Sequence, residues 1–258
     1  MLLAFYATFT GLKAQSISDS FYLQMTHIFQ HVDTTKVATG LLKDYGMDFA
    51  DVINFDGVQV SDTNIVYSNI WNDLYTSLYT YRFTNAPVLV SPDSVFNSQG
   101  SLAQAGNFVP LSLLFYQYSM YKDHAADNGL VTVSNGQIYD KYVNSVWQNP
   151  YNQNTLMAVT AGTDMFNQYS ITFQLPAALK LTNYGNIQSI QGDFADGSGY
   201  RNIMTNTSFT VNYPDTGQKI IQFKITLATG QTFSSRTGIW IYPGNTNMSL
   251  SRTKKSSK

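Results

Sequence analysis

The stretch that decides the fold is Gly192–Tyr213, GDFADGSGYRNIMTNTSFTVNY, with the segment PDTGQKIIQFKITL directly after it. Residues typical of tight turns gather twice, at Asp193–Gly197 and at Tyr213–Gly217. Beyond the second turn, four apolar residues alternate strictly with polar ones: Ile221, Phe223, Ile225 and Leu227. That alternation is the period of a half-buried β-strand. The stretch therefore predicts turns that join the strands of one small β-sandwich, and it indicates a fold rather than a reaction.

The same alternation predicts which side chains this strand buries. Successive side chains of a strand point to opposite faces of the sheet. Phe223 and Ile225 should therefore face the core, and Gln222 and Lys224 should face the solvent.

The composition limits the classes of partner. The chain has 258 residues, a net charge of −1 and 12% charged residues, about half of the usual share of roughly 25%. Its polarity comes instead from Asn, Ser, Thr and Gln. We therefore expect an unknown protein or a glycan as the partner, and no nucleic acid. The sequence contains no Cys, which excludes disulfides, thiolate metal sites and a Cys nucleophile.

The first residues, MLLAFYATFTGLKAQ, form an apolar run of signal-peptide length that ends in small residues near Ala14. Cleavage after Ala14 would leave Gln15 at the new terminus. The run is too short to span a bilayer. The alternative is a buried N-terminal helix. We expect a signal peptide over residues 1–14, and hence a secreted or cell-surface protein without a transmembrane span.

The next part of the chain is predicted to be mainly helical. Ser18–Val32 places its apolar side chains on one face of a helix. Asp62–Phe83 carries the clearest apolar stripe, at spacings of three and four, and its first residue can cap the helix. Glycines break residues 34–56 into turns, and Pro87 and Pro92 close the region.

The pattern then changes to β-strands. The run VPLSLLFYQYSMY at 109–121 is long and apolar. Asn135-Gly136, flanked by β-branched residues, is a strong hairpin signal. Shorter strands are predicted at Leu156–Val159 and Ile171–Leu175.

The region from about Tyr169 to Tyr242 resembles a PKD-type module, the immunoglobulin-like domain named after polycystic kidney disease. The matching motifs are DFADG at Asp193–Gly197 and the YPDTG turn at Tyr213–Gly217, before the alternating strand. The chain departs from the family at Gly192, where the family often has Trp, and at Lys219, where it often has Tyr. The resemblance implies a β-sandwich in an exported, often bacterial, multidomain protein, where such modules act as spacers or adhesion units.

Together these features predict an α+β protein with a helical N-terminal region, a β-rich segment and a C-terminal immunoglobulin-like or PKD-like β-sandwich. The predicted segments are a signal peptide at 1–14, a helical region at 15–105, a β-rich middle at 106–167, the sandwich at 168–245 and a disordered basic tail at 246–258.

Two groups of residues are candidate metal ligands. His27 and His31 are four apart on the predicted helix, a spacing that puts two imidazoles on one face. The alternative is a pair of solvated histidines. Asp193 and Asp196 could bind calcium, since some PKD-type modules are similar to calcium-binding sandwiches. Otherwise their side chains bond the backbone of the turn. No other cofactor is predicted.

A further acidic cluster surrounds two glycines and comprises Asp44, Asp48, Asp51 and Asp56. These carboxylates could offer oxygens to a hard cation such as calcium. The spacing does not fit an EF-hand loop, and Asp is common in turns for its own backbone hydrogen bonds.

Three aromatic residues are a candidate ligand-binding surface. Trp147 lies among Asn, Gln and Pro, with Tyr142 and Tyr151 close to it in the sequence. The C–H faces of a sugar ring pack on aromatic faces, while amides bond its hydroxyls. The pattern therefore indicates sugar binding, and the alternative is a partly buried aromatic residue in a loop.

The common catalytic signatures are not found in the sequence, among them G-x-S-x-G, the Walker A loop, G-x-G-x-x-G and H-E-x-x-H. A glycosidase needs only two carboxylates and leaves no readable motif. We expect a non-catalytic exported protein that binds an unknown ligand or acts as a spacer. The alternatives are the N-terminal, non-catalytic portion of a longer secreted hydrolase and a carbohydrate-binding module.

Overall fold

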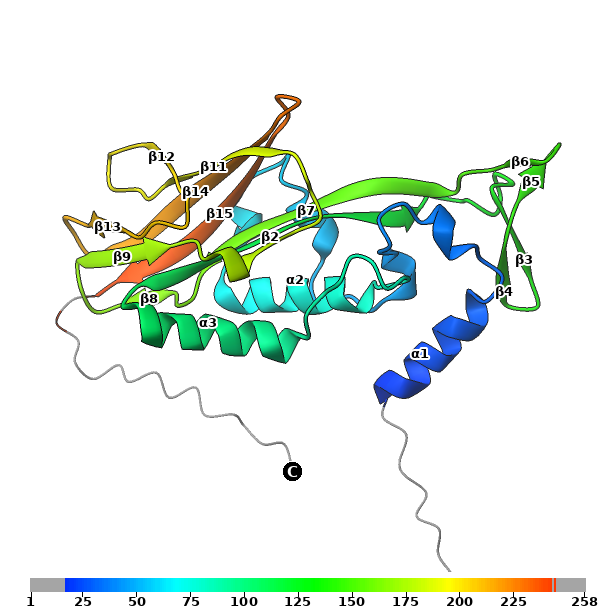
Figure 1. The fold of residues 1–258 in the computed structure, drawn as a ribbon, viewed down its shortest axis with the longest axis horizontal. Helices are drawn as coiled ribbons and strands as arrows, with labels where there is room; N and C mark the ends of the chain where they lie inside the picture. Colours follow the sequence, from blue (N-terminus) through cyan, green and yellow to red (C-terminus); the bar gives the residue numbers. More distant parts are fainter. Residues whose placement is uncertain (1–16, 243, 245–258) are drawn as a thin grey trace, which may run out of the picture. The chain divides into compact units, whose positions relative to one another are not determined.

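The structure confirms that the protein is α+β. The computed structural model describes residues 17–242 and residue 244. The predicted signal peptide at 1–14 and the predicted tail at 246–258 lie outside these residues. The described chain contains helices and several β-sheets (Figure 1).

The described chain divides into two compact units. Unit 1 takes its residues from Met1–Asp33 and Asp123–Pro150, and unit 2 takes its residues from Thr34–Lys122 and Tyr151–Lys258. Unit 2 therefore combines parts of the predicted helical region, the β-rich middle and the C-terminal sandwich.

Three α-helices occur in the described residues: α1 (Ile17–Ile28), α2 (Ser68–Thr80) and α3 (Pro92–Gly106). Short 3-10 helices accompany them: η1 (Thr34–Lys36), η2 (Lys43–Tyr45), η3 (Val52–Phe55), η4 (Asp62–Asn64) and η5 (Ala177–Leu179). The prediction that helices are confined to the N-terminal region is wrong, because η5 lies within the predicted sandwich.

The starts of two helices differ from the prediction. The predicted cap Asp62 belongs to η4, which Ser61 caps through a capping box, and α2 begins only after the short strand that follows. The sequence pattern does not predict α3, because Pro92 indicates a stop. Pro92 instead occupies the first turn of α3, where a proline costs no hydrogen bond, and the Ser91 hydroxyl caps the helix.

Two sheets form the β-structure of unit 2. The first has the order β1 (Ile65–Val66), β15 (Thr232–Ile241), β14 (Gly217–Leu227), β11 (Ile187–Asp193) and β12 (Tyr200–Asn202), with β8 (Met165–Phe166) also beside β15. The second has the order β10 (Lys180–Thr182), β2 (Val109–Tyr121), β9 (Ser170–Gln174) and β13 (Phe209–Asn212), with β7 (Tyr151–Ala161) also beside β2.

Unit 1 contains α1 and two hairpins. The hairpins pair β3 (Val131–Ser134) with β4 (Gln137–Asp140), and β5 (Tyr142–Val143) with β6 (Val146–Trp147). The first hairpin confirms the predicted turn at Asn135-Gly136, whose φ angles are 51° and 72°. None of the helices in the described residues has the length and apolar content needed to cross a bilayer.

The strand pair β2–β7 is buried on both faces. Alternate side chains of β2 enter the core between the two sheets, namely Leu111, Leu113 and Phe115. The others enter a second core with α2 and α3, namely Leu114, Tyr116 and Tyr118. Figure 1 shows both helices lying along this strand pair. Burial on both faces explains why residues 109–121 are a largely apolar run rather than an alternating one.

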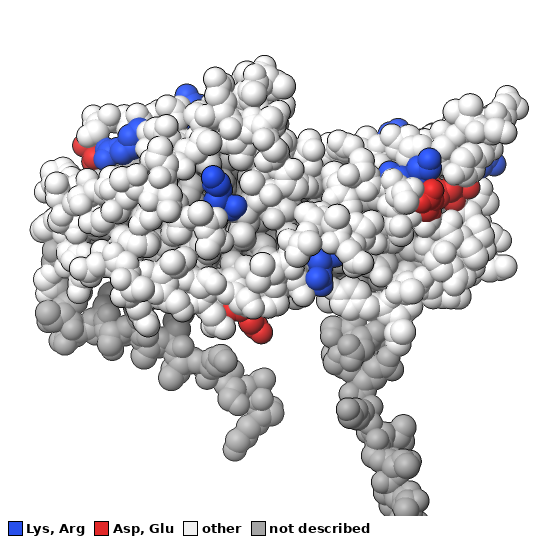
Figure 2. All heavy atoms as spheres, in the orientation of Figure 1, with Lys and Arg blue, Asp and Glu red and all other residues white. Residues whose placement is uncertain are grey.

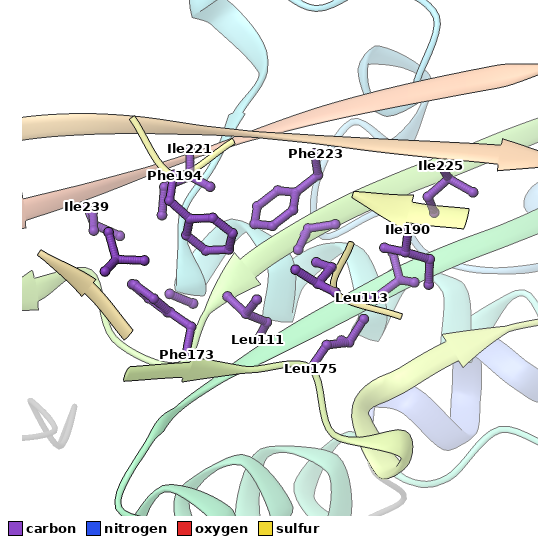
Figure 3. Close-up of a cluster of buried hydrophobic side chains, with 14 of the residues drawn as sticks. Leu111, Leu113, Phe173, Leu175, Ile190, Phe194, Ile221, Phe223, Ile225 and Ile239 are labelled. Atoms are coloured by element: carbon purple, nitrogen blue, oxygen red, sulfur yellow. The ribbon is translucent and has the colours of Figure 1, made fainter. Parts of the chain in front are cut away.

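The two sheets of unit 2 share one core. Figure 3 shows Phe173 and Leu111 from the second sheet pointing toward Phe194 and Phe223 on the side of the first. Phe223 and Ile225 are fully buried, whereas Gln222 is exposed and Lys224 is half-buried. The predicted alternation of β14 is thereby confirmed.

The edge of β2 opposite β7 is closed by several different groups. Beyond the residues of β2 that pair with β10, the Asn183 side-chain amide bonds the backbone N–H and carbonyl of Gln117, at 2.8 and 2.9 Å. The backbone N–H of Ser119 donates to the Leu41 carbonyl at 2.8 Å, and that of Tyr121 donates to the Asp44 carboxylate at 2.9 Å. An amide side chain thus takes the place of a neighbouring strand at Gln117.

Candidate functional site

Two aromatic side chains face outward at the end of β15. Ile239 and Ile241 are fully buried in the core between the sheets, so the alternation of the strand directs Trp240 and the following Tyr242 to the other face. Trp240 is half-buried, and Tyr242 is 36% exposed. Their ring centroids are 5.9 Å apart and their planes differ by only 6°. The outer face of the sheet therefore presents a pair of parallel rings.

Tyr67, the residue before α2, adds a third ring. It lies over Gly238, where a Cβ would come within 2.7 Å of Tyr67 Cε1, so the close approach requires glycine. The Tyr67 hydroxyl accepts a hydrogen bond of 3.0 Å from Nε2 of Gln218. Gln218 is the cross-strand partner of Trp240, so its amide lies on the same face as the ring.

Asp164 fixes these rings relative to one another. Its carboxylate accepts hydrogen bonds from the backbone N–H and the hydroxyl of Ser68, at 3.2 and 2.9 Å. Ser68 is the first residue of α2, where a negative charge is favoured by the helix dipole. The Asp164 carbonyl also accepts a bond of 2.8 Å from the backbone N–H of Trp240. Asp164 thus ties the start of α2, and with it Tyr67, to the strand that carries Trp240.

These residues surround a hollow of about 270 Å³, here called the aromatic hollow, lined by Tyr67, Asn69, Asp164, Met165, Trp240 and Tyr242. Ring faces and the Met165 side chain offer apolar contact. The Asn69 amide and the tyrosine hydroxyls offer hydrogen bonds. Such a combination suits a ligand with both C–H faces and hydroxyl groups, as sugars have.

The structure does not bring the three predicted sugar-binding residues together in one described surface. Tyr142 and Trp147 are cross-strand partners in the β5–β6 hairpin of unit 1, with Tyr142 51% exposed. The Trp147 indole donates a hydrogen bond of 3.0 Å to the Asp140 carboxylate. Tyr151 belongs to unit 2 and is buried there against Tyr121, with ring centroids 5.0 Å apart. The hairpin keeps one exposed tyrosine and one half-buried tryptophan.

His27 and His31 do not share a helical face, because α1 ends at Ile28. The His31 ring stacks on Tyr139 of β4, with centroids 4.4 Å apart and planes 10° apart. His27 lies beside the Gln137 amide, whose nitrogen is 3.3 Å from its Nδ1. Each histidine therefore contacts the β3–β4 hairpin of unit 1 separately.

Asp193 and Asp196 bond the backbone of their turn. Asp193 accepts a hydrogen bond from the N–H of Ala195 at 3.0 Å, and Asp196 accepts one from Ser198 at 3.2 Å. Asp196 also receives two bonds from one nitrogen of Arg201, at 2.7 and 2.6 Å. Burial raises the pKa of Asp196, but the bonds from Arg201 and Ser198 outweigh it and hold the pKa below its ordinary value of 3.8. Within the described residues, no three His, Asp or Glu side chains gather as a metal site.

The Asp196–Arg201 pair predicts a pH-dependent stability. A carboxyl with a lowered folded-state pKa stabilises the fold above its unfolded-state pKa, and this contribution is lost as the pH falls through the folded-state value. We expect Asp196→Asn to lower the free energy of unfolding by about 1.5–3 kcal/mol at pH 7, as for hydrogen bonds to charged groups. The difference from the wild type should shrink below about pH 4, measured by urea unfolding at pH 7 and pH 3.

Asp215→Asn is the matched control for this measurement. Asp215 pairs with Lys219, but its side chain is 70% exposed, whereas that of Asp196 is only 9% exposed. The exposed pair should contribute under about 1 kcal/mol at either pH. A loss for Asp196→Asn that stays constant between pH 7 and pH 3 would contradict the assignment of the partly buried ion pair.

The acidic cluster of residues 44–56 is engaged in hydrogen bonds within the protein, some local and some to residues far away in the sequence. Asp44 accepts a hydrogen bond from the N–H of Tyr121, and Asp48 accepts from the side chains of Lys43 and Tyr81. Asp51 accepts from the amide of Asn54, and Asp56 accepts from the N–H groups of Val58 and Gln59. Burial, followed by the hydrogen bond to Asp48, raises the pKa of Tyr81 far above its ordinary value. Asp51 and Asp56 therefore organise turns before α2, as Asp commonly does, whereas Asp44 and Asp48 connect this segment to β2 and to the end of α2.

The residues of the aromatic hollow are not among the predicted site residues. The segment GIWIY at 238–242 contains a sequence signal for two of them, Trp240 and Tyr242. If Ile239 and Ile241 face a core, then Trp240 and Tyr242 must face away from it. Large aromatic side chains on the outer face of a strand indicate a contact surface. Tyr67 and Asp164 have no such signal, because only the tertiary fold brings them to β15.

The chain matches neither a described protein family nor any curated protein, so its function is inferred from its own residues and their geometry.

Proposed function

We propose that this chain is a non-catalytic, exported binding protein that takes a neutral glycan at the aromatic hollow. The observation that carries the proposal is the pair of parallel rings of Trp240 and Tyr242, held outward on β15 beside Tyr67. The Asp164 carboxylate accepts two hydrogen bonds from Ser68, so its role in the hollow is to hold α2 in place.

A neutral glycan fits the chemistry of this surface. Rings bury the C–H faces of sugars without any charge, and the amide of Asn69 can donate to sugar hydroxyls and accept from them. On the face drawn in Figure 2, most side chains are neither acidic nor basic. Binding through rings and neutral polar groups is therefore in keeping with a chain in which only 12% of residues are charged.

We further propose that the C-terminal region is a PKD-like module that carries this surface. In support, Asp193 and Asp196 bond the backbone of the DFADG turn, and the alternating strand β14 faces a core that two sheets share. The apolar run at residues 1–14 supports export, and thus a secreted or cell-surface location. In this proposal the module presents the glycan-binding rings and spaces them from other parts of the protein.

The test is binding to neutral oligosaccharides, selected on a glycan array and measured by calorimetry. Trp240→Ala and Tyr242→Ala should each weaken binding at least about tenfold, as aromatic anchors do at interfaces. Tyr169→Ala is the control, because Tyr169 is an exposed tyrosine that does not line the hollow. The ligand should be recovered uncleaved. Failure to bind any neutral glycan, or equal affinities for all three variants, would refute the proposal.

A further inference from the structure

A second region of unit 2 has the form of a binding site, and it shares no residue with the aromatic hollow. It consists of two hollows of about 670 and 500 Å³, both within the usual range of small-molecule sites of about 300–1,000 Å³. Thr34, Thr84 and Pro87 line both hollows, so the two adjoin. We call them together the polar groove.

The lining of the polar groove carries one kind of charge. Eight of the lining residues carry a hydroxyl or amide side chain: Thr34, Thr35, Thr39, Thr84, Asn85, Gln117, Gln153 and Asn183. Among the described residues that line it, only Arg82 is charged, and that charge is positive. A ligand that matches this surface has many hydroxyl groups and one negative group.

Arg82 is held in position by the end of α2. Its Nε donates a hydrogen bond of 2.8 Å to the carbonyl of Tyr79, and its guanidinium lies 3.5 Å above the centre of the Tyr79 ring. Carbonyls at a helix C-terminus attract a cation. With Nε engaged in this way, the two terminal nitrogens form the edge that suits a carboxylate. Arg201 and Arg236, by contrast, bond the carboxylates of Asp196 and Asp62.

The walls of the groove are fixed by backbone contacts. The Gly40 carbonyl accepts hydrogen bonds from the N–H groups of Phe83 and Thr84, at 3.0 and 3.1 Å. The Thr84 hydroxyl donates to the carbonyl of Ala86 at 2.6 Å. On the other side, the Asn183 amide is fixed by its two bonds to Gln117. A rigid groove loses little conformational entropy when it binds a ligand.

From this arrangement we propose that the polar groove binds an acidic saccharide, with a sugar carboxylate on Arg82 and sugar hydroxyls on the Thr, Asn and Gln side chains. Arginine binds a carboxylate through two parallel hydrogen bonds, which adds orientation to the electrostatic attraction. The ligand class is therefore a uronic-acid saccharide. Arg82 selects the acid, and the hydroxyl and amide lining selects the sugar.

The experiment uses the full chain and an oligomer of a uronic acid, oligogalacturonate, with its methyl ester as the uncharged counterpart. Calorimetry should show binding of the acid, and at least about tenfold weaker binding of the ester. Arg82→Gln should weaken binding of the acid by a similar factor. Arg82→Lys should restore only part of the affinity, because an ammonium is a point charge that cannot form the paired bonds.

Matched variants separate binding at Arg82 from binding elsewhere on the protein. Lys224→Gln removes one positive charge outside the groove and should leave the affinity unchanged. Trp240→Ala should also leave it unchanged, so that loss of glycan binding at the aromatic hollow is a separate result. Equal binding of the acid and the ester by the wild-type protein would overturn the proposal. This comparison does not depend on the folding of any variant. Acetate competing as well as the oligomer would show a site for small anions and overturn it too.

Discussion

Phe223→Ala is expected to lower the free energy of unfolding by about 3–5 kcal/mol, the cost of removing a phenylalanine from a packed core. Phe223 is fully buried at the middle of β14, and its ring meets Phe194 edge to face, with centroids 5.9 Å apart. The substitution removes this contact and leaves a cavity between the two sheets (Figure 3). Urea unfolding at pH 7 measures the change.

Lys224→Ala is the control for this experiment, one position further along the same strand. Lys224 faces outward, and its Nζ lies 5.0 Å from the centre of the Tyr200 ring. Its loss should cost no more than about 1 kcal/mol, the value of an exposed cation–π contact. Similar losses from the two substitutions would show that the register assigned to β14 is wrong.

Gly40→Ala should be the most disruptive single-atom change in unit 2. The φ angle of Gly40 is +69°, and a Cβ there would stand 1.6 Å from the carbonyl oxygen of Ala86. Backbone strain of about 1–3 kcal/mol adds to an overpacking cost of about 1–3 kcal/mol. We expect a loss of stability of about 2–6 kcal/mol, with displacement of the Thr84–Pro87 wall of the polar groove.

Gly100→Ala is the matched substitution at a permissive site. Gly100 lies inside α3, is exposed, and has no atom within 4 Å of the position its Cβ would take. Alanine favours a helix by about 0.5–1 kcal/mol over glycine, so this variant should be slightly more stable than the wild type. Thermal unfolding of the two variants gives the comparison. A Gly40→Ala protein as stable as the wild type would contradict the close approach.

The parts of the fold that the sequence predicts are those with a local signal. The alternation of β14 and the Asn135-Gly136 turn each need only neighbouring residues, and both are confirmed. The prediction of a stop at Pro92 is wrong because a proline can begin a helix as well as end one, and the choice depends on the cap at Ser91. The run at 109–121 indicates a buried strand but does not reveal that its two faces enter different cores.

The candidate sites depend on contacts between residues far apart in the chain, and this limits what the sequence predicts. Tyr67 meets Gly238, and Asp164 meets Ser68, across separations that no periodicity encodes. Arg82 is positioned by Tyr79 nearby, but the neutral walls of the groove come from residues 34–40 and 83–89 together with β2, β7 and Asn183. In contrast, the residues around Trp147 have a composition that suggests sugar binding, but composition alone does not determine where a side chain lies in the fold.

The closed edge of β2 has a bearing on how this protein avoids self-association. An open edge of a long apolar strand is a template on which the same strand of another molecule can pair, and so begin a fibril. The Asn183 amide, the Leu41 carbonyl and the Asp44 carboxylate occupy the hydrogen-bonding groups at Gln117, Ser119 and Tyr121. The Asn183 amide thus helps to keep β2, the longest strand in the described residues, from pairing with the same strand of another molecule.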